Sequence, residues 1–146
     1  MQYRHTFTVN ASIERVADFH RASASMAAIT PLPILVRLHR APDILTEGDE
    51  LRFTLWLGPL ALRWLARIEG VSDTGFTDKQ IDGPFQHWEH RHSYQALGTD
   101  RTLVIDKVSA TVKKHWFWGL IGRFMWWSLP VLFAYRGWKT RALLSS

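Results

Sequence analysis

The first residues of the chain alternate between apolar and polar side chains, a pattern typical of a half-buried β-strand. The residues on its apolar face are Tyr3, His5, Phe7 and Val9. Apolar residues then recur at helical spacing after Ser12, whose hydroxyl is suited to capping a helix N-terminus. A second short helical segment is predicted over residues 22–29, ahead of Pro31. The start of the chain therefore predicts one strand followed by two short helices.

Six more segments with strand character follow, separated by short breaks. We place them at residues 34–40, 50–57, 60–71, 75–82, 85–97 and 102–112. Gly58-Pro59 and Gly83-Pro84 are turn signals between consecutive strands. A long apolar segment over residues 116–144 then predicts a helix. This order predicts an α+β fold in which seven antiparallel strands form a curved sheet around the C-terminal helix.

The alternation within the strands also predicts which side chains face the final helix. Successive side chains of a strand point to opposite faces, so residues two apart share a face. The predicted inward residues are Leu62, Trp64, Ala66 and Ile68; Phe76, Asp78, Gln80 and Asp82; Trp88, His90, His92 and Tyr94; and Thr102, Val104, Asp106, Val108 and Ala110. Most of these are aromatic or aliphatic, and any chemistry is expected at the polar exceptions.

Two carboxylates and two imidazoles are the main polar exceptions. A buried carboxylate needs a donor, and strand order makes His90 and His92 the nearest donors to Asp78 and Asp106. An Asp–His pair is the minimal equipment for general acid–base catalysis, so these four residues are the candidate catalytic residues. A structural or ligand-orienting polar network is the alternative, because buried polar groups are generally satisfied whether or not they act.

A metal site is a further alternative for the same residues. Histidines at i and i+2 of one strand point the same way and, with Asp78 or Asp106, could ligate zinc or a similar ion. The spacing is generic, however, and His87 on the opposite face is expected at the surface. We therefore predict no metal and no cofactor.

The C-terminal segment has the length of a membrane span. Residues 116–135 would form a helix of about 30 Å with Arg123 as the only charged side chain. Placing an arginine near the middle of a span costs about 2.5–3.5 kcal/mol, and Gly119, Gly122 and Pro130 weaken the pattern further. The predicted sheet also needs a helix to cover its apolar face, so we expect a helix of the fold and not a span.

This helix has two apolar stripes on a helical wheel. One stripe contains Phe117, Leu120, Phe124, Trp127, Val131, Tyr135 and Trp138, and the other contains Trp118, Ile121, Met125, Leu129, Leu132 and Phe133. If one stripe faces the sheet, the other needs a membrane surface, a second copy of the chain or a protruding lipid. Alternatively, Pro130 kinks the helix and the fold buries both stripes. The basic residues that would suit anionic headgroups are Lys113, Lys114, His115, Arg136, Lys139 and Arg141.

Composition narrows the function classes. At 146 residues the chain is expected to form one domain over residues 1–146. The absence of cysteine excludes disulfides, thiolate catalysis and cysteine-ligated metals. A net charge of +5 attracts nucleic acid or an anionic membrane, but the basic residues are scattered and match no nucleic-acid motif, so no nucleic-acid partner is expected. The N-terminus shows no secretory signal, which predicts a cytoplasmic location.

One extended pattern resembles a known family. The pattern is Phe76-x-Asp78-x-Gln80-x-x-Gly83-Pro84-Phe85-x-x-Trp88-x-His90-x-His92-x-Tyr94, followed by a strand with Asp106 and a long terminal helix. It is similar to the bacterial branch of the START and birch-pollen-allergen superfamily, often labelled SRPBCC or polyketide cyclase/dehydrase and lipid transport. The resemblance covers nearly the whole chain and implies a helix-grip fold with a ligand cavity between sheet and helix. Because this superfamily includes carriers, receptors and enzymes, it does not imply one activity.

The leading functional prediction is a non-catalytic carrier that holds a hydrophobic molecule, such as a lipid, a quinone or a polyketide-like ring system, in that cavity. The expected ligand-binding residues are Trp64, Phe76, Gln80, Trp88, His90, His92, Tyr94, Asp106, Phe117, Leu120 and Phe124. The first alternative is a cyclase or dehydratase in which His90 or His92, held by an aspartate, moves protons. The second is a membrane-associated interaction module, peripheral at the inner face of the membrane through residues 116–138, or a homodimer.

Overall fold

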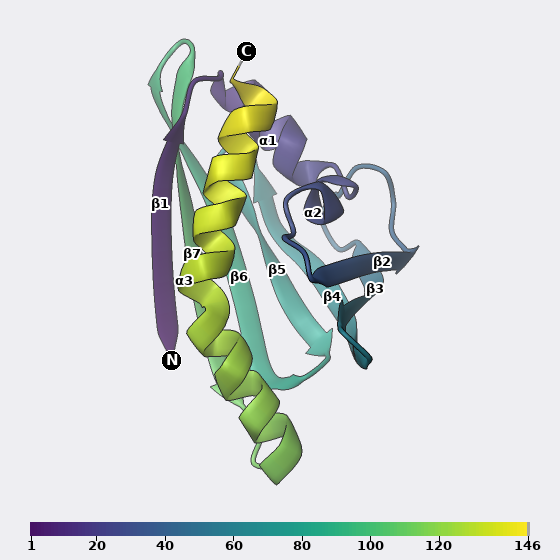
Figure 1. Ribbon diagram of the computed structural model, residues 1–146. Helices are drawn as coiled ribbons and strands as arrows, with labels where there is room; N and C mark the ends of the chain where they lie inside the picture. Colours follow the sequence, from purple (N-terminus) through teal and green to yellow (C-terminus); the bar gives the residue numbers. More distant parts are fainter. Residues whose placement is uncertain (146) are drawn as a thin grey trace.

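The computed structural model describes residues 1–145 and shows a curved sheet with one long helix across its concave face (Figure 1). The strands are β1 (Gln2–Val9), β2 (Ile34–Arg40), β3 (Glu50–Leu57), β4 (Leu60–Ser72), β5 (Gly75–Asp82), β6 (Phe85–Gly98) and β7 (Arg101–Val112). The helices are α1 (Ile13–Arg21), α2 (Ser25–Ala28) and α3 (Trp116–Leu144). The predicted element order and the α+β helix-grip fold are therefore confirmed, and strand ends differ from the prediction by at most one residue.

The strand order places the two short helices across one end of the molecule. The sheet runs β1-β7-β6-β5-β4-β3-β2, and every neighbouring pair is antiparallel. Because β1 and β2 form opposite edges, the chain between them has to cross from one side of the sheet to the other. The segment containing α1 and α2 makes this crossing beside the C-terminal half of α3 (Figure 1).

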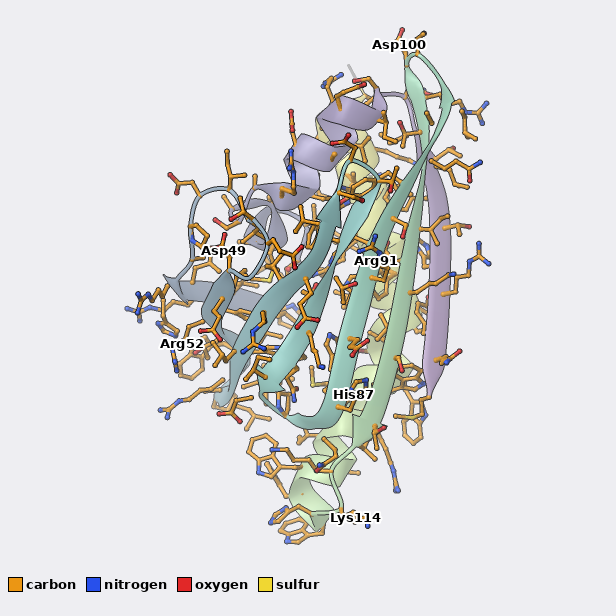
Figure 2. All side chains as sticks on the ribbon, turned by 180° about the vertical axis from the view of Figure 1, so that it is seen from behind. Asp49, Arg52, His87, Arg91, Asp100 and Lys114 are labelled. Carbon is orange, nitrogen blue, oxygen red and sulfur yellow. The ribbon has the colours of Figure 1, made fainter. Side chains whose placement is uncertain are left out.

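The two faces of the sheet differ in polarity as the alternation predicts. On β4, Leu62, Trp64 and Ile68 are buried, while Arg63 between them is exposed. The convex face carries polar and charged side chains, among which Arg91 is labelled in Figure 2. The inward assignment of Leu62, Trp64, Ala66 and Ile68 is confirmed, because only the concave face has a helix to cover apolar side chains.

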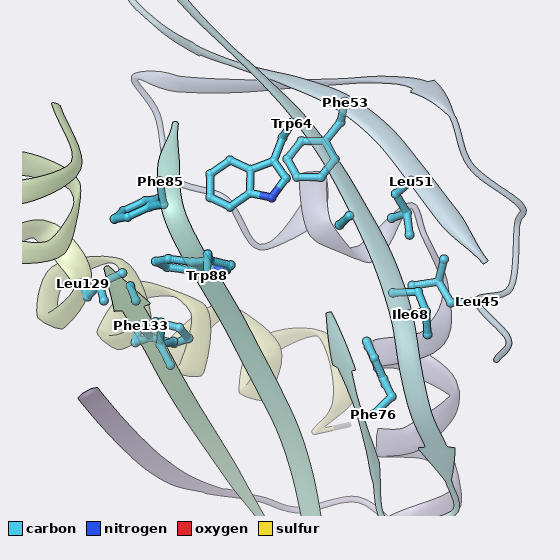
Figure 3. Packing of buried hydrophobic residues seen from close by; sticks show 13 residues of the cluster. Leu45, Leu51, Phe53, Trp64, Ile68, Phe76, Phe85, Trp88, Leu129 and Phe133 are labelled. Atoms are coloured by element: carbon cyan, nitrogen blue, oxygen red, sulfur yellow. The ribbon is translucent and has the colours of Figure 1, made fainter. Parts of the chain in front are cut away.

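Aromatic side chains form the centre of the larger core cluster (Figure 3). The Trp64 ring stacks on Phe53 with ring centroids 5.8 Å apart and meets Trp88 edge-on at 5.5 Å. Phe85 lies 4.9 Å from Trp88 between ring centroids. Offset and edge-on aromatic pairs add stability beyond the apolar area they bury. This cluster fixes the part of the concave face from which the functional site is built.

Only one side of α3 packs against the sheet. Leu129 and Phe133 are each 2% exposed, whereas Trp127 and Val131 are 73% and 74% exposed. The helix continues through Pro130 as one element. The alternative in which the fold buries both apolar stripes is therefore wrong: the stripe containing Leu129 and Phe133 faces the sheet, and most of the other faces outward.

By length and composition alone, α3 is long and apolar enough to cross a membrane. In the structure, however, it lies along the concave face and contacts β1, β6 and β7 (Figure 1). Close approach requires small residues on the inner side of the helix. A Cβ atom added to Gly119 would stand 2.7 Å from the Lys113 carbonyl oxygen, and one added to Gly122 would stand 3.0 Å from a Val112 methyl carbon.

Candidate functional site

A cavity of about 480 Å³ lies between the sheet, the α2–β2 segment and α3. This volume is within the roughly 300–1,000 Å³ of typical small-molecule sites. Its apolar wall includes Leu51, Phe53, Leu55, Trp64, Phe76, Trp88, Leu129 and Leu132. Its polar wall includes His20, Asp78, His90, His92, Ser128 and Arg136. A mostly apolar cavity with a few convergent polar groups is the usual form of a ligand site.

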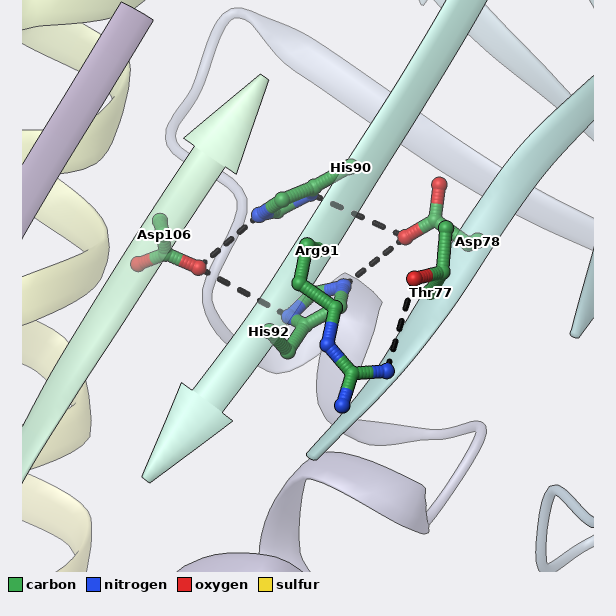
Figure 4. Close-up of polar contacts among 6 residues, drawn as sticks. All are labelled: Thr77, Asp78, His90, Arg91, His92 and Asp106. Carbon is green, nitrogen blue, oxygen red and sulfur yellow. Dashed lines mark hydrogen bonds and ion pairs between the residues drawn. The ribbon is translucent and has the colours of Figure 1, made fainter. Parts of the chain in front are cut away.

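Four of the predicted residues form a closed polar cluster at this wall (Figure 4). His90 Nε2 lies 2.8 Å from Asp106 Oδ1, and His92 Nε2 lies 2.8 Å from Asp78 Oδ2. The second nitrogen of each ring is 3.7 Å and 3.6 Å from the other carboxylate. The two imidazole rings are 3.8 Å apart between centroids. Each imidazole therefore lies between both carboxylates, as the prediction of Asp–His pairing requires.

Charge and burial determine where the protons lie in this polar cluster, which we define as Asp78, His90, His92 and Asp106. Burial raises the pKa of each carboxyl, but the hydrogen bond from its histidine and the nearby imidazoles outweigh burial and hold both pKa values below their ordinary range. An ionised carboxylate only accepts hydrogen bonds, so each Nε2 carries the donated proton.

The protonation of His92 follows mainly from its burial. Burial, assisted by the neighbouring His90, lowers the pKa of His92 to about 4 despite the two carboxylates. His92 is therefore neutral at pH 7, with its proton on Nε2. Its Nδ1 is buried and has no hydrogen-bond partner within residues 1–145. The cluster keeps the Asp78 carboxylate ionised beside an apolar cavity.

Two titratable residues of the cavity wall, His20 and Arg136, were not predicted as site residues. His20 Nδ1 donates to the Val16 carbonyl oxygen over 2.8 Å, and burial lowers the pKa of this imidazole. The free nitrogen of neutral His20 is then Nε2. Arg136 comes from α3, and its guanidinium lies 5.7 Å from the centroid of the Phe133 ring. Helical spacing places both beside apolar residues, because His20 follows Val16 by four residues and Arg136 follows Phe133 by three, but it does not give the side of the helix that faces the cavity.

Arg136 is a cation of the cavity wall without a polar partner among residues 1–145. Its Nε atom is buried without a hydrogen-bond partner, and no hydrogen bond or ion pair joins its guanidinium to any residue within 1–145. Burial lowers the pKa of Arg136, and the charges of Asp106 and Asp78 oppose this. Asp78 is the anionic group of the same wall. Both of its imidazole contacts use Oδ2, so Oδ1 contacts neither histidine. The wall thus offers a free cation and a free acceptor oxygen.

Several predicted binding residues occupy other positions. Gln80 closes the β5–β6 turn, because its amide bonds the backbone nitrogen and oxygen of Phe85 at 3.1 and 2.8 Å. Tyr94 is buried against His20, with ring centroids 5.1 Å apart, outside the cavity wall. Asp106 lies behind His90 and does not line the cavity.

The helix residues of the predicted binding set divide in the same way. Leu120 is 59% exposed on the outward side of α3, and Phe117 is half-buried outside the cavity wall. Phe124 does line the cavity, although it is 61% exposed. The prediction took the wrong stripe of α3 as the wall, and Met125, Leu129 and Leu132 line the cavity in its place. Trp64, Phe76, Trp88, His90 and His92 line it as expected.

The polar cluster also has the composition of a metal site. Asp78, His90 and His92 each offer a ligand atom, and these atoms lie within 4.8 Å of one another. Imidazole nitrogen and carboxylate oxygen are suitable ligands for zinc. In this structure, however, the same groups are hydrogen-bonded to each other or to Asp106. Hydrogen bonds from imidazole to carboxylate account for the Nε2 atoms of both histidines.

Comparison with known proteins identifies the fold. No protein-family model matches the sequence, and a search of curated proteins finds no match. Among solved structures, the Zhui aromatase/cyclase from Streptomyces sp. R1128 is 17% identical with a TM-score of 0.70, covering 99% of this chain and 96% of that one. A START superfamily protein from Mycobacterium smegmatis is 15% identical with a TM-score of 0.66, covering 98% and 96%.

A plant protein shares the same architecture. Ginseng major latex-like protein 151 from Panax ginseng is 12% identical with a TM-score of 0.68, covering 100% of this chain and 98% of its own. At these identities the likeness shows the fold alone. The resemblance to START-like and birch-pollen-allergen-like proteins is thereby confirmed as a shared helix-grip fold.

Proposed function

We propose that this protein binds a hydrophobic small molecule whose head group is an acid or another strong hydrogen-bond acceptor. The observation that carries the proposal is the unpartnered Arg136 guanidinium at the wall of an otherwise mostly apolar cavity of about 480 Å³. Arg136 is half-buried, and its buried Nε atom lacks a partner; leaving a buried polar group unsatisfied is costly, and such groups in native proteins usually have a ligand, an ion or water that satisfies them. A carboxylate, enolate or carbonyl oxygen would satisfy Arg136.

The remaining polar groups of the cavity wall indicate a further feature of this ligand. Asp78 Oδ1 and His20 Nε2 can accept hydrogen bonds, so a hydroxyl near the acidic group would find a partner at the same wall. The hydrophobic part would lie against Trp64, Leu129 and the other apolar residues, where burial of apolar area supplies most of the affinity. The polar cluster would orient the head group by keeping Asp78 fixed and ionised.

A matched pair of ligands tests the proposal. Dodecanoic acid and its methyl ester differ in charge but hardly in apolar area, so calorimetric titration with each isolates the contribution of the head group. A charge-assisted hydrogen bond contributes about 1.5–3 kcal/mol, so the acid should bind about tenfold or more tightly than the ester. Arg136→Met should lower the affinity for the acid to that for the ester, and Arg136→Lys should retain part of the preference.

The control lies on the same helix. Arg123 is exposed on the outward side of α3, so Arg123→Met changes the net charge equally without touching the cavity. This variant should keep the preference for the acid. Equal binding of acid and ester by the native protein, or equal loss in both arginine variants, would contradict the proposed head group. Failure of both ligands to bind would contradict the apolar cavity as a ligand site.

A second candidate function is proton transfer on a carbonyl compound. It is favoured by the polar cluster of two Asp–His pairs and by the aromatase/cyclase among the proteins that share the fold. The geometry favours it less than binding, because both histidine Nε2 atoms point at carboxylates and the His92 Nδ1 atom is buried. Hydrogen–deuterium exchange α to the carbonyl of an aromatic ketone, followed by NMR, tests it. Acceleration that Asp78→Asn abolishes would favour an enzyme.

A further inference from the structure

The outward side of α3 carries a continuous row of large apolar side chains. We define this row as the outer ridge; its members are Trp116, Leu120, Phe124, Trp127, Val131 and Trp138, with exposed fractions of 79%, 59%, 61%, 73%, 74% and 61%. They recur at spacings of three, four and seven residues, so they share one side of the helix. From Trp116 to Trp138 the helix rises about 33 Å. A contiguous exposed apolar surface of this kind marks an interaction site.

The charged side chains of the C-terminal part of the sequence are all of one sign. After Asp106 the sequence contains no aspartate or glutamate, whereas it contains seven lysines and arginines: Lys107, Lys113, Lys114, Arg123, Arg136, Lys139 and Arg141. Lys114 and Arg123 are exposed. An apolar helix surface rich in tryptophan, on a helix whose charged side chains are all positive, is complementary to an anionic lipid surface.

Three of the residues predicted to meet headgroups have other positions. Arg136 lines the cavity, and the His115 imidazole accepts hydrogen bonds from the backbone nitrogens of Phe117 and Trp118 at the helix N-terminus. Arg141 donates from Nε to the Thr8 carbonyl oxygen over 2.8 Å. The basic groups left to meet a surface are mainly Lys114 and Arg123, near the N-terminal half of α3. The beginning of this half extends beyond the end of the sheet (Figure 1).

The outer ridge also reaches the cavity. Phe124 belongs to the ridge and lines the cavity as well. On the other side, Pro33 lines the cavity, and the adjacent Leu32 is 79% exposed. An apolar surface against these residues would therefore meet the cavity wall directly, and a hydrophobic molecule could pass between them without crossing water.

We propose that the outer ridge docks in the plane of an anionic lipid bilayer, so that the cavity opens toward the membrane. Docking leaves the inner side of α3 on the sheet, in agreement with the burial of Leu129 and Phe133. A second copy of the chain fits the ridge less well, because ridge-to-ridge pairing brings the basic residues of two copies together with no carboxylate on either helix. This docking does not depend on which molecule occupies the cavity.

Vesicle cosedimentation tests the docking. The native protein is mixed with vesicles of phosphatidylcholine alone or of phosphatidylcholine with phosphatidylglycerol. It should partition at least about tenfold more strongly into the anionic vesicles, and added salt should reduce this difference. Trp127→Ser should lower the partition coefficient about tenfold, since it removes one large buried apolar group. Arg123→Glu should abolish the preference for anionic vesicles.

A tryptophan on another surface provides the matched control. Trp56 on β3 is 38% exposed and does not line the cavity, so Trp56→Ser should leave vesicle binding unchanged. Equal effects of Trp56→Ser and Trp127→Ser, or no vesicle binding at all, would overturn the proposal. So would a dimer in analytical ultracentrifugation that Trp127→Ser dissociates, or vesicle-bound protein that alkaline carbonate does not release, because these indicate a second copy or a membrane span.

The same variants distinguish membrane docking from ligand binding in the cavity. Trp127 is absent from the cavity wall, so Trp127→Ser should bind dodecanoic acid in preference to its ester as the native protein does. Loss of vesicle binding with retained acid preference supports docking through the ridge. Retained vesicle binding in Arg136→Met, with the acid preference lost, would show that docking and ligand binding fail independently.

Discussion

The inner and outer sides of α3 have similar hydrophobicity but opposite environments. The inner side presents Gly119, Gly122, Leu129 and Phe133, all buried. The outer side presents the ridge, in which Trp127 is 73% exposed. The larger aromatic surface is therefore the one that the fold leaves uncovered. Apolar character alone does not identify the packed side of this helix; the two glycines do, because Gly119 and Gly122 lie closely against the Lys113 carbonyl oxygen and the Val112 side chain.

Removing a large side chain from each side gives the strongest test of this difference. Phe133 is 2% exposed and contacts Tyr3, His5 and His90 through its ring. Phe133→Ala should lower the free energy of unfolding by about 3–5 kcal/mol, because it leaves a cavity among packed rings. Trp127→Ala should change it by only about 0.5 kcal/mol, as at other surface positions. Urea denaturation of both variants provides the comparison, and equal losses would contradict the assignment of the two sides.

Acid titration should destabilise the protein through His92, which lines the cavity together with residues of the inner side of α3. The pKa of His92 is about 4 in the folded protein and near 6.5 in the unfolded chain. As the pH falls, the unfolded chain takes up this proton first, so the contribution to stability is complete above about pH 6.5 and is lost progressively toward pH 4. The loss is about 3 kcal/mol by pH 4. The free energy of unfolding, measured in urea at several pH values, should show this decline.

The variant His92→Gln isolates the contribution of His92 to the pH dependence of the free energy of unfolding. Its amide can still donate to Asp78 but does not titrate, so the decline between pH 6.5 and 4 should become shallower. Part of the slope should remain, because burial lowers the pKa of His20 as well. An unchanged slope in His92→Gln would show that His92 is not the neutral group we infer.

A single added methyl group should produce the smallest measurable effect. In Gly119→Ala the new Cβ atom would lie 2.7 Å from the Lys113 carbonyl oxygen, which is backbone and cannot move freely. We expect a loss of about 1–2 kcal/mol, even though alanine is the better helix former. Gly98→Ala is the control, since nothing lies within 4 Å of the added Cβ atom. A stabilised Gly119→Ala protein would show that the inner side is less closely packed than the structure indicates.

The sheet was predictable from sequence because its signals are local. Alternation fixed the inward residues of β4, and the Gly-Pro pairs marked two turns. The same alternation placed Asp78, His90, His92 and Asp106 on one face. It could not give their pairing, since the contact of His90 with Asp106 depends on strand register, which only the folded sheet defines.

The helix side of the site was harder to predict. Both wheel stripes are apolar, so hydrophobicity gave no reason to prefer the one containing Leu129 over the one containing Leu120. Gly119 and Gly122 carried that information. The orientation of α3 on the sheet determines the role of Arg136. From the sequence, Arg136 is a charge at the end of an apolar segment and is expected at the surface; the folded helix places it in the cavity wall. Gln80 was misplaced for another reason: its amide satisfies the backbone of a tight turn.

Nuclear magnetic resonance of the tryptophan indole groups tests the central claim most directly, because tryptophans lie both in the cavity wall and on the outer ridge. Trp64 and Trp88 line the cavity, whereas Trp116, Trp127 and Trp138 belong to the outer ridge. Dodecanoic acid should shift the indole N–H signals of Trp64 and Trp88 and leave the ridge signals in place. Shifts confined to the ridge tryptophans on addition of the acid would contradict a ligand cavity between the sheet and the inner side of α3.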